Sequence, residues 1–535
     1  MTDGTYRATE RFGELELIGL DSVFTALEVY CDNLLPDLEA CLVFLSRILR
    51  DRDAAAHPRT REWVTLLARK LRDLGPFHPQ GLELVHKLTG DPALDARLER
   101  MRYFTLEPQL MDLRGVMSDP GVMRRKRTLL TETLDRMPAH VLAASQLLQL
   151  EFYQGVNQPE WLGSFTPPKF FRQEWTQRLF LHYAGLGDAE RAMPIWSEVA
   201  AMPLSEVQLN LAAECFVKCG ETEQAMACYR ESLRLDPHQT PVRLRMAELE
   251  QPSRADNALV HQSKVAVCLY SWNKAEDLER TLAGLAETDL GPAIVRVLLN
   301  GCTDHSAEVA EAARVLFPDN DYDIITLPVN IGAPAARNWL GALPEVRACD
   351  FLAYLDDDVE LPADWLAHFL TVMRRYPDTS AVGAKVVFGS EPRMIQYIYR
   401  SFAVAEPEII KLTDPCQVGQ FDAGHYDFVR ETDAVMGCCH LLRMAHLPDG
   451  PQFDVRYSPS QVDDTAHDIR LRLQGGEVRY CGLVKCVHHQ NTGGGFKRQL
   501  DAARIGQVHG NDMKFQAWLA AQREKVERLM RKSGK

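Results

Sequence analysis

Beyond Lys264, short apolar runs alternate with stretches of helical spacing, and this alternation constrains the fold more than any other feature of the chain. The apolar runs are Val265–Leu269, Val295–Leu299 and Phe351–Leu355. Short apolar runs separated by helical segments are typical of a parallel sheet with crossover helices. We therefore predict a Rossmann-like α/β domain with a mostly parallel sheet over residues 259–500, followed by a helical extension over residues 501–535.

The residues before this domain are rich in Leu, Ala, Glu and Arg, with apolar positions three and four apart, which predicts helices. One pattern recurs 33 positions later, where Gly187, Ala192 and Trp196 return as Gly220, Ala225 and Tyr229. Small residues at fixed places let the two helices of a hairpin pack closely. We predict an all-α N-terminal half: a helical region over 1–170, then tetratricopeptide-like repeats over 171–258. These helices either only buttress the second domain or form a groove that binds a peptide or protein.

Composition and charge exclude several classes of protein. The chain has 535 residues, with 60 Lys plus Arg against 74 Asp plus Glu, a net charge of −14 that disfavours nonspecific nucleic-acid binding. The sequence has no apolar run of about 18 residues and no secretion signal at its start, so we expect a cytoplasmic protein without a transmembrane segment. Its 13 scattered cysteines favour reduced thiols over a disulfide framework.

Polar turns follow three of the predicted strands, and ligands of open α/β sheets bind beyond the carboxyl ends of strands. The candidates for holding a nucleotide are Ser271 and Asn273 after the first strand, Asn300 and Asp304 after the second, and Asn330, Arg337 and Asn338 after the strand at 322–327. The sequence has neither the GxGxxG motif nor the GxxxxGK[ST] motif. A dinucleotide fingerprint and a P-loop are therefore both absent.

Three consecutive carboxylates, Asp356, Asp357 and Asp358, directly follow the apolar run Phe351–Leu355. Carboxylates at the end of a buried strand repel one another and lose hydration, so something positive must neutralise them. Mg²⁺ or Mn²⁺ is the natural partner, because such cations prefer one or two carboxylates together with substrate phosphate oxygens. The alternative is a solvated acidic loop before a helix that starts near Pro362.

The order of these motifs resembles that of family 2 glycosyltransferases with the GT-A fold, over roughly residues 264–490. The resemblance implies a hexosyltransferase-like enzyme that transfers a sugar from a nucleotide-sugar donor with inversion. It further implies that Asp356 and Asp358 hold the metal, that Asp357 reaches the ribose or the donor sugar, and that Asp304 helps to hold the nucleobase. The family more often has Asp at the position of Asn300.

The resemblance continues toward the C-terminus. It places Gly437 and Cys438 on the acceptor side, where a glycine lets substrate approach. His488 and His489 become candidates for completing the metal site or contacting the diphosphate.

The acidic stretch near residue 463 then supplies the catalytic base, because an inverting displacement needs one carboxylate to accept the proton of the acceptor hydroxyl. The candidates are Asp463 and Asp464. These two lie farther upstream of Asp468 and Arg472 than the family's acidic pair usually does, so Asp468 remains open as well. The alternative is a helix N-terminus that acidic residues stabilise.

Two other functional classes compete with the transferase. A nucleotidyltransferase usually has a glycine-rich basic loop after the first strand, and Ser271-Trp272-Asn273-Lys274 does not supply one. A noncatalytic adaptor would keep the helical half but lose the acidic pairs, which are present here. The predicted partners are therefore a nucleotide-sugar and an acceptor glycan or protein, the latter held by the helical half. The sequence does not determine the sugar, the nucleobase, the acceptor or the oligomeric state.

Overall fold

The computed structural model describes residues 12–34, 38–111, 120–406, 409–413, 420–490 and 502–532. The chain divides into two compact units. The first, here called the helical unit, comprises residues 1–246 and 417–425; the second, the sheet unit, comprises residues 247–416 and 426–535. The sequence predicts consecutive segments instead, because a short excursion inside an α/β domain has no pattern that reveals which core it joins.

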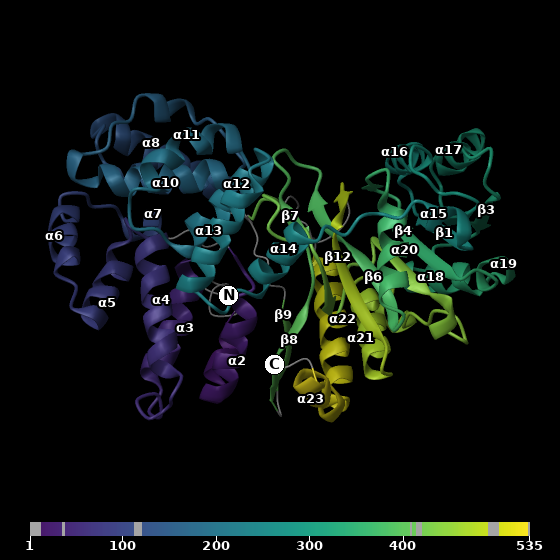
Figure 1. Ribbon diagram of the computed structural model, residues 1–535. Helices are drawn as coiled ribbons and strands as arrows, with labels where there is room; N and C mark the ends of the chain where they lie inside the picture. The colour runs from purple at the N-terminus through teal and green to yellow at the C-terminus, as the bar shows by residue number, and fades with distance from the viewer. Residues whose placement is uncertain are drawn as a thin grey trace. The chain divides into compact units, whose positions relative to one another are not determined.

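Among its described residues, the helical unit consists mainly of α-helices, shown from purple to teal in Figure 1, with short 3-10 helices at Gly13–Glu16, Glu160–Gly163 and Lys169–Phe171. The α-helices are α2 (Leu20–Tyr30), α3 (Leu38–Arg50), α4 (Thr60–Leu74), α5 (Pro79–Thr89), α6 (Pro92–Met101), α7 (Pro108–Met111), α8 (Pro120–Arg136), α9 (Val141–Tyr153), α10 (Arg172–Gly185), α11 (Ala189–Val199), α12 (Glu206–Lys218), α13 (Thr222–Leu235) and α14 (Thr240–Glu250). The predicted all-α half is thereby confirmed.

The predicted repeats fall on two helix pairs, α10 with α11 and α12 with α13. The turn inside each pair passes through a glycine at positive φ, Gly187 at 77° and Gly220 at 78°, a conformation that side chains disfavour. Ala192 and Ala225, the small residues of the pattern, are fully buried. The tetratricopeptide relationship itself stays a prediction.

The core of the helical unit includes part of the segment that returns from the sheet unit. Ala423 joins the apolar cluster of Phe180, Trp196 and their neighbours. Phe421 is buried and meets the ring of Phe152 edge to face, with centroids 5.4 Å apart. Residues 420–425 are therefore part of this core, although they lie far along the chain from the helices.

The sheet unit contains a mixed, mostly parallel ten-stranded sheet, which confirms the predicted α/β class. The strand order is β10-β12-β6-β11-β4-β1-β2-β3, with β5 beside β12 and β7 beside β6. The strands are β1 (Val265–Ser271), β2 (Ile294–Asn300), β3 (Tyr322–Leu327), β4 (Phe351–Asp356), β5 (Val359–Glu360), β6 (Thr379–Phe388), β7 (Ile395–Tyr397), β10 (Val429–Thr432), β11 (Cys439–Arg443) and β12 (Glu477–His488). The helices that accompany this sheet are α15 (Ala258–Gln262), α16 (Ala275–Ala286), α17 (Ser306–Ala313), α18 (Ala333–Ala342), α19 (Pro344–Arg347), α20 (Trp365–Arg375) and α21 (Asp463–Leu473).

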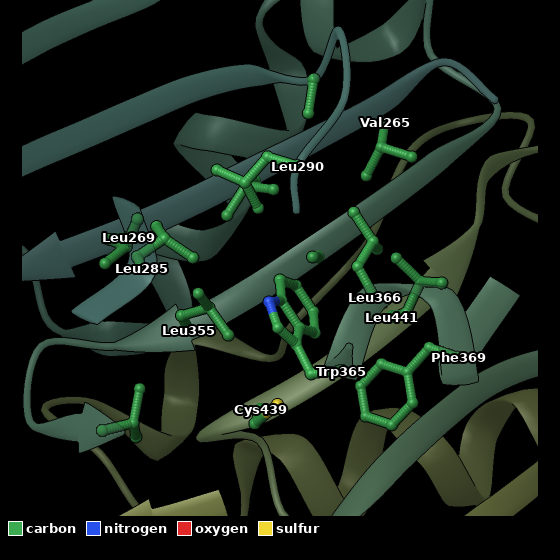
Figure 2. Packing of buried hydrophobic residues seen from close by; sticks show 14 of the residues in the cluster. Val265, Leu269, Leu285, Leu290, Leu355, Trp365, Leu366, Phe369, Cys439 and Leu441 are labelled. Carbon is green, nitrogen blue, oxygen red and sulfur yellow. The ribbon is translucent and has the colours of Figure 1, made fainter. Parts of the chain in front are cut away.

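Apolar side chains of the parallel strands pack against the helices on the sheet (Figure 2). Leu269 of β1 and Leu355 of β4 share this core with Trp365 and Phe369 of α20, and all four are fully buried. Strands covered on both faces read as continuous apolar runs, which explains why the sequence identifies them.

The C-terminal extension forms two helices, α22 (Ala502–Ala521) and α23 (Arg523–Lys532). Figure 1 shows them beside the hairpin of β8 (Ser401–Glu406) and β9 (Ile409–Thr413), which they contact. Leu519 and Val526 are fully buried in the cluster that Phe402 and Ile410 share. Among the described helices, none is long and apolar enough to cross a membrane.

Candidate active site

The acidic turn lies between strands that come from distant parts of the chain. Asp356 ends β4 and is the register partner of Tyr270 at the end of β1. Asp357 and Asp358 form the turn into β5, and Val359 of β5 pairs with His488 at the end of β12. The sheet thus brings an acidic turn and a histidine about 130 positions later to one edge.

Three of the predicted metal ligands gather at this edge. Asp356, Asp358 and His488 each offer one ligand atom, and these atoms all lie within 4.8 Å of one another. His488 Nε2 is 3.0 Å from Asp358 Oδ1 and 4.0 Å from Asp356 Oδ2. Two carboxylate oxygens and one imidazole nitrogen form a donor set that fits a divalent cation and suits Mn²⁺ better than Mg²⁺.

His489 lies apart from this cluster. Its Nε2 is 2.7 Å from Glu360 Oε1, while its backbone N–H donates to the carbonyl of Asp358. Successive residues of an extended strand point to opposite faces, so only one of two adjacent histidines can reach the carboxylates. The sequence offered both residues as ligands, and the structure brings only His488 to the site.

Lys274 neutralises the acidic turn from the side of β1, a contact that the sequence did not predict. Its Nζ is 2.8 Å from Asp358 Oδ2 and 3.1 Å from Asp357 Oδ1. Burial raises the pKa of Asp357 to about 6, against the opposing effect of Lys274. Burial also raises the pKa of Asp358, but the hydrogen bond and charge of His488, together with Lys274, outweigh it and hold that pKa below its ordinary value.

Arg337 of α18 connects the acidic turn to the predicted base. Its Nη1 is 2.5 Å from Asp463 Oδ2, and its Nη2 is 3.5 Å from Asp356 Oδ1. The guanidinium lies over the ring of Tyr270, 5.2 Å from its centroid. Tyr270, another residue that the sequence did not single out, donates its hydroxyl proton to Asp356 Oδ1 at 2.8 Å.

Most of the predicted nucleotide contacts bond to the backbone or side chains of neighbouring turns. Their side-chain oxygens accept hydrogen bonds from the next turn, so these residues hold the three turns in register. Their contact with a nucleotide-sugar stays a prediction. The bonds are Thr303 N–H to Asn273 Oδ1 at 2.7 Å, Ala275 N–H to Asp304 Oδ2 at 3.1 Å, Ile331 N–H to Asn300 Oδ1 at 2.9 Å and Asn300 Nδ2 to Asn330 Oδ1 at 3.0 Å.

Ser271 and Asn338 occupy equally constrained positions. Ser271 is buried at the end of β1, and its carbonyl accepts from the thiol of Cys302 at 3.3 Å. Asn338 exchanges two hydrogen bonds with the backbone of Phe453, at 2.8 and 2.7 Å. Trp272 lies in the turn between β1 and α16. It is 54% exposed and offers a large aromatic ring at the same edge of the sheet.

The predicted acceptor-side residues contact both the acidic turn after β4 and the acidic pair at the start of α21. Gly437 N–H donates to Asp464 Oδ2 at 2.8 Å, and the carbonyl of Cys438 accepts from the backbone N–H of Asp356 at 3.0 Å. A Cβ atom on Gly437 would lie 2.8 Å from Asp464 Cβ and 3.0 Å from Arg337 Nη2. This position therefore requires glycine.

The three candidate bases lie on α21 and differ in access. Asp463 is 2% exposed and bonded to Arg337, and burial raises its pKa to about 6 despite that partner. Asp468 is 3% exposed, and its Oδ2 accepts from the backbone N–H of Val435 at 2.9 Å. Asp464 is only partly buried. Val462, directly before the helix, has φ of 69°, a strained value for a β-branched residue. This backbone conformation determines the direction in which α21 and its acidic pair begin.

Comparison with known proteins identifies the domain that carries this site. Residues 266–443 match the model of the family described as glycosyl transferase family 2. This segment includes the acidic turn and Gly437, while the candidate bases and His488 lie beyond it. No curated protein matches the chain.

Several solved structures resemble part of the chain at low sequence identity. GalNAc-T7 with UDP, GalNAc and Mn²⁺ is 10% identical, over 42% of this chain and 44% of its own, with a TM-score of 0.34. The mannosyltransferase PcManGT from Pyrobaculum calidifontis, with GDP-Man and Mn²⁺, is 16% identical, over 50% of this chain and 70% of its own, with a TM-score of 0.33. S. aureus TarS 1-349 with UDP-GlcNAc is 13% identical, over 44% of this chain and 61% of its own, with a TM-score of 0.32. The chain thus spans less than half of the GalNAc-T7 chain.

All three TM-scores are below 0.5, so the assignment rests on the family match. Residues 266–443 are a family 2 glycosyltransferase domain, the kind of domain that moves a sugar from a nucleotide-sugar. The match favours the transferase over the nucleotidyltransferase that the acidic turn also allowed.

Proposed function

Starting from a family 2 glycosyltransferase domain at residues 266–443, we propose that this protein transfers a sugar from a nucleotide-sugar to an acceptor hydroxyl with inversion, assisted by a divalent cation. The observation that carries the proposal is the convergence of Asp356, Asp358 and His488, whose ligand atoms lie within 4.8 Å of one another. The carboxylates and imidazole suit Mn²⁺, and Mg²⁺ is the alternative cation.

The leaving group of such a transfer is a nucleoside diphosphate, whose negative charge must be stabilised as the sugar departs. When bound, the cation supplies positive charge to the diphosphate. Lys274 and Arg337 add two fixed positive charges beside the same acidic turn. The partly neutralised Asp357 then remains close to the donor, where a carboxyl can bond to a sugar or ribose hydroxyl.

Asp464 is the proposed catalytic base. A base must lie within hydrogen-bond reach of the acceptor hydroxyl, and Asp464 is the more exposed member of the acidic pair. Asp463 and Asp468 are both buried, whereas Asp464, which accepts backbone N–H bonds from Gly437 and Thr465, keeps part of its surface exposed. Gly437 lies directly against Asp464, and a Cβ atom there would lie 2.8 Å from Asp464 Cβ, so only glycine leaves the proposed base in its position.

The nucleobase has a candidate platform in Trp272. Its ring is 54% exposed, and it follows β1 at the edge where nucleotides bind in such sheets. Stacking on an aromatic ring accepts any base, so this contact does not select the nucleotide. Asp304, in the neighbouring turn, is exposed and offers carboxylate oxygens to the base or the ribose.

We further propose that the acceptor is a protein or a glycan on a protein, engaged by the helical unit. Paired helices such as α10/α11 and α12/α13 are typical of arrays that bind peptides along a shared surface. Intact-mass spectrometry of proteins co-expressed with the enzyme tests this. A hexose-sized increase that disappears in Asp464→Asn supports a protein acceptor, and modification of free glycans alone contradicts it.

The decisive experiment measures thermal stabilisation by UDP-, GDP-, TDP- and CMP-sugars, with and without Mn²⁺. A donor at 100 times its dissociation constant adds about 2.7 kcal/mol to the free energy of unfolding. We expect one nucleotide class to stabilise the wild type only with metal, and the effect to vanish in Asp356→Ala and Asp358→Ala. Asp319→Ala, which removes an exposed carboxylate in a distant loop, is the matched control. Stabilisation by no donor would contradict the transferase and favour a noncatalytic adaptor.

A further inference from the structure

A histidine can bind a cation through only one of its two ring nitrogens, and the partner of the other nitrogen decides which. His488 Nε2 faces Asp358, whereas its Nδ1 lies 3.0 Å from Gln396 Oε1. An amide oxygen only accepts hydrogen bonds, so it requires the proton on Nδ1. The neutral ring then presents the Nε2 lone pair toward Asp356 and Asp358.

An irregularity in the pairing of β7 places Gln396 beside His488. Along the antiparallel β6–β7 pair, Val386 pairs with Tyr397 and Val387 pairs with Ile395. Two consecutive residues of β6 therefore oppose three of β7, and Gln396 is the extra one. Such a β-bulge turns the side chain of the extra residue out of the regular alternation, and bulges are frequent beside active sites.

A second amide fixes the orientation of the first. Gln396 Nε2 donates to Gln490 Oε1 at 2.8 Å, which leaves Gln396 Oε1 directed at His488. With its nitrogen bonded to Gln490, the Gln396 amide cannot rotate its oxygen away from His488 without losing both bonds. The chain of bonds thus runs from Gln490 through Gln396 to Nδ1 of His488, and it leaves Nε2 on the side of Asp358, 3.0 Å from its Oδ1.

We propose that Gln396 is a positioning residue for metal binding, because it holds His488 in the tautomer and ring orientation that aim Nε2 at the cation. The inference rests on the cation site of the proposed function and assigns a role to a residue outside the motifs that the sequence analysis singles out. Hydrogen-bond partners of a ligand histidine typically change metal affinity about 10–100-fold when they are removed.

The test is a titration of the protein with Mn²⁺ in the absence of any nucleotide-sugar. Electron paramagnetic resonance measures the concentration of free Mn²⁺ at each step. Gln396→Met keeps the length of the side chain but removes the acceptor, and we expect Mn²⁺ to bind about 10–100-fold more weakly. Gln396→Glu restores an acceptor for Nδ1–H and should return the affinity close to that of the wild type. Because Met is as long as Gln, a role limited to packing predicts little loss of Mn²⁺ affinity in Gln396→Met. Gln177→Met makes the same change on a partly buried side chain of the helical unit, which donates to the carbonyl of Pro203, and serves as control.

Asp358→Ala removes a proposed ligand and gives the reference for lost Mn²⁺ binding. If Asp358→Ala abolishes Mn²⁺ binding while Gln396→Met binds like the wild type, the inference is wrong and the proposed function stands. Equal weakening by Gln396→Met and Gln396→Glu also overturns it. If the wild type binds no Mn²⁺, both the cation site and this inference are wrong. Thermal stabilisation by nucleotide-sugars then still tests whether the protein is a transferase. Should Gln396→Met not fold, Gln490→Met removes the partner that orients the amide, and unchanged affinity there overturns the inference.

Discussion

The two units of this protein treat buried charge differently. In the helical unit, Lys70 lies 2.6 Å from Glu206 and 2.8 Å from Asp236, all three are buried, and Arg69 adds a further positive charge near Glu206. In the sheet unit, the acidic side chains outnumber their positive partners. Among the described residues, the carboxylates of Asp356, Asp357, Asp358 and Asp463 pair with Lys274, Arg337 and His488, while Asp464 accepts from the backbone N–H of Gly437.

The pKa directions follow this difference. Burial raises the pKa of Glu206 and Asp236, but Lys70 outweighs it, so both pKa values lie below their ordinary values. Burial dominates at Asp357 and Asp463, whose pKa rises to about 6. Buried charges that serve folding are balanced within the chain, whereas the surplus of carboxylate in the sheet unit marks a place where a cation completes the balance.

The strongest test of this contrast breaks the balance in the helical unit. Lys70→Met leaves Glu206 and Asp236 buried without their shared partner, which should lower the free energy of unfolding by about 3–5 kcal/mol. Denaturant unfolding monitored by circular dichroism measures it. Lys87→Met, on an exposed face of α5, is the control and should change stability by no more than about 0.5 kcal/mol. An equally small effect for Lys70→Met would show that the buried pair is not a folding element.

The next test separates the acids of the sheet unit by role. Asp464→Asn should lower kcat about 10²–10⁴-fold, because a positioned general base contributes a factor of that size. Its affinity for Mn²⁺ should not change. Asp463→Asn acts through Arg337 instead and should raise KM for the donor. Steady-state kinetics with the donor found by thermal stabilisation distinguishes them, and Asp319→Asn is the control. A kcat loss in Asp463→Asn alone would move the base to that residue.

A smaller effect is expected from Tyr270→Phe. This change keeps the ring under Arg337 and removes only the hydroxyl that bonds to Asp356. Without that bond Asp356 is less firmly oriented, so we expect Mn²⁺ affinity to fall about tenfold, at the lower end of the range for partners of metal ligands. Tyr322→Phe, which removes a buried hydroxyl bonded to the carbonyl of Ala310, is the matched control. Equal Mn²⁺ affinities in the two variants would rule out this role for Tyr270.

The smallest effect concerns pH. Glu206 and Asp236 have pKa values below 4.5 and 3.8, so their stabilising effect is present above these values and is lost as the pH falls through them. Asp463, with a raised pKa, acts in the opposite sense and favours the folded state as the pH falls through about 6. Hydrogen exchange measured from pH 6 down to below pH 3.8, corrected for intrinsic rates, should therefore show protection decreasing in α4 and α12 before α21. Earlier loss in α21 would contradict the assignment.

The sequence identified those features of the fold and site that depend on local pattern. Apolar runs gave the parallel strands, because a strand covered on both faces is apolar throughout. Asp356 and Asp358 were recognised because three carboxylates after a buried strand are costly without a cation. The sequence did not reveal Tyr270, Lys274 or Gln396, whose residue types are ordinary and whose roles depend on partners at least 83 positions away.

What the sequence by itself determined is the class of each half and the presence of an acidic site after β4. Only the tertiary structure decided which of His488 and His489 reaches that site, because strand alternation and the β5–β12 pairing select one of two adjacent residues. Only the tertiary structure assigned residues 420–425 to the helical core. Both outcomes depend on packing between distant segments, and local patterns of polarity do not encode such packing.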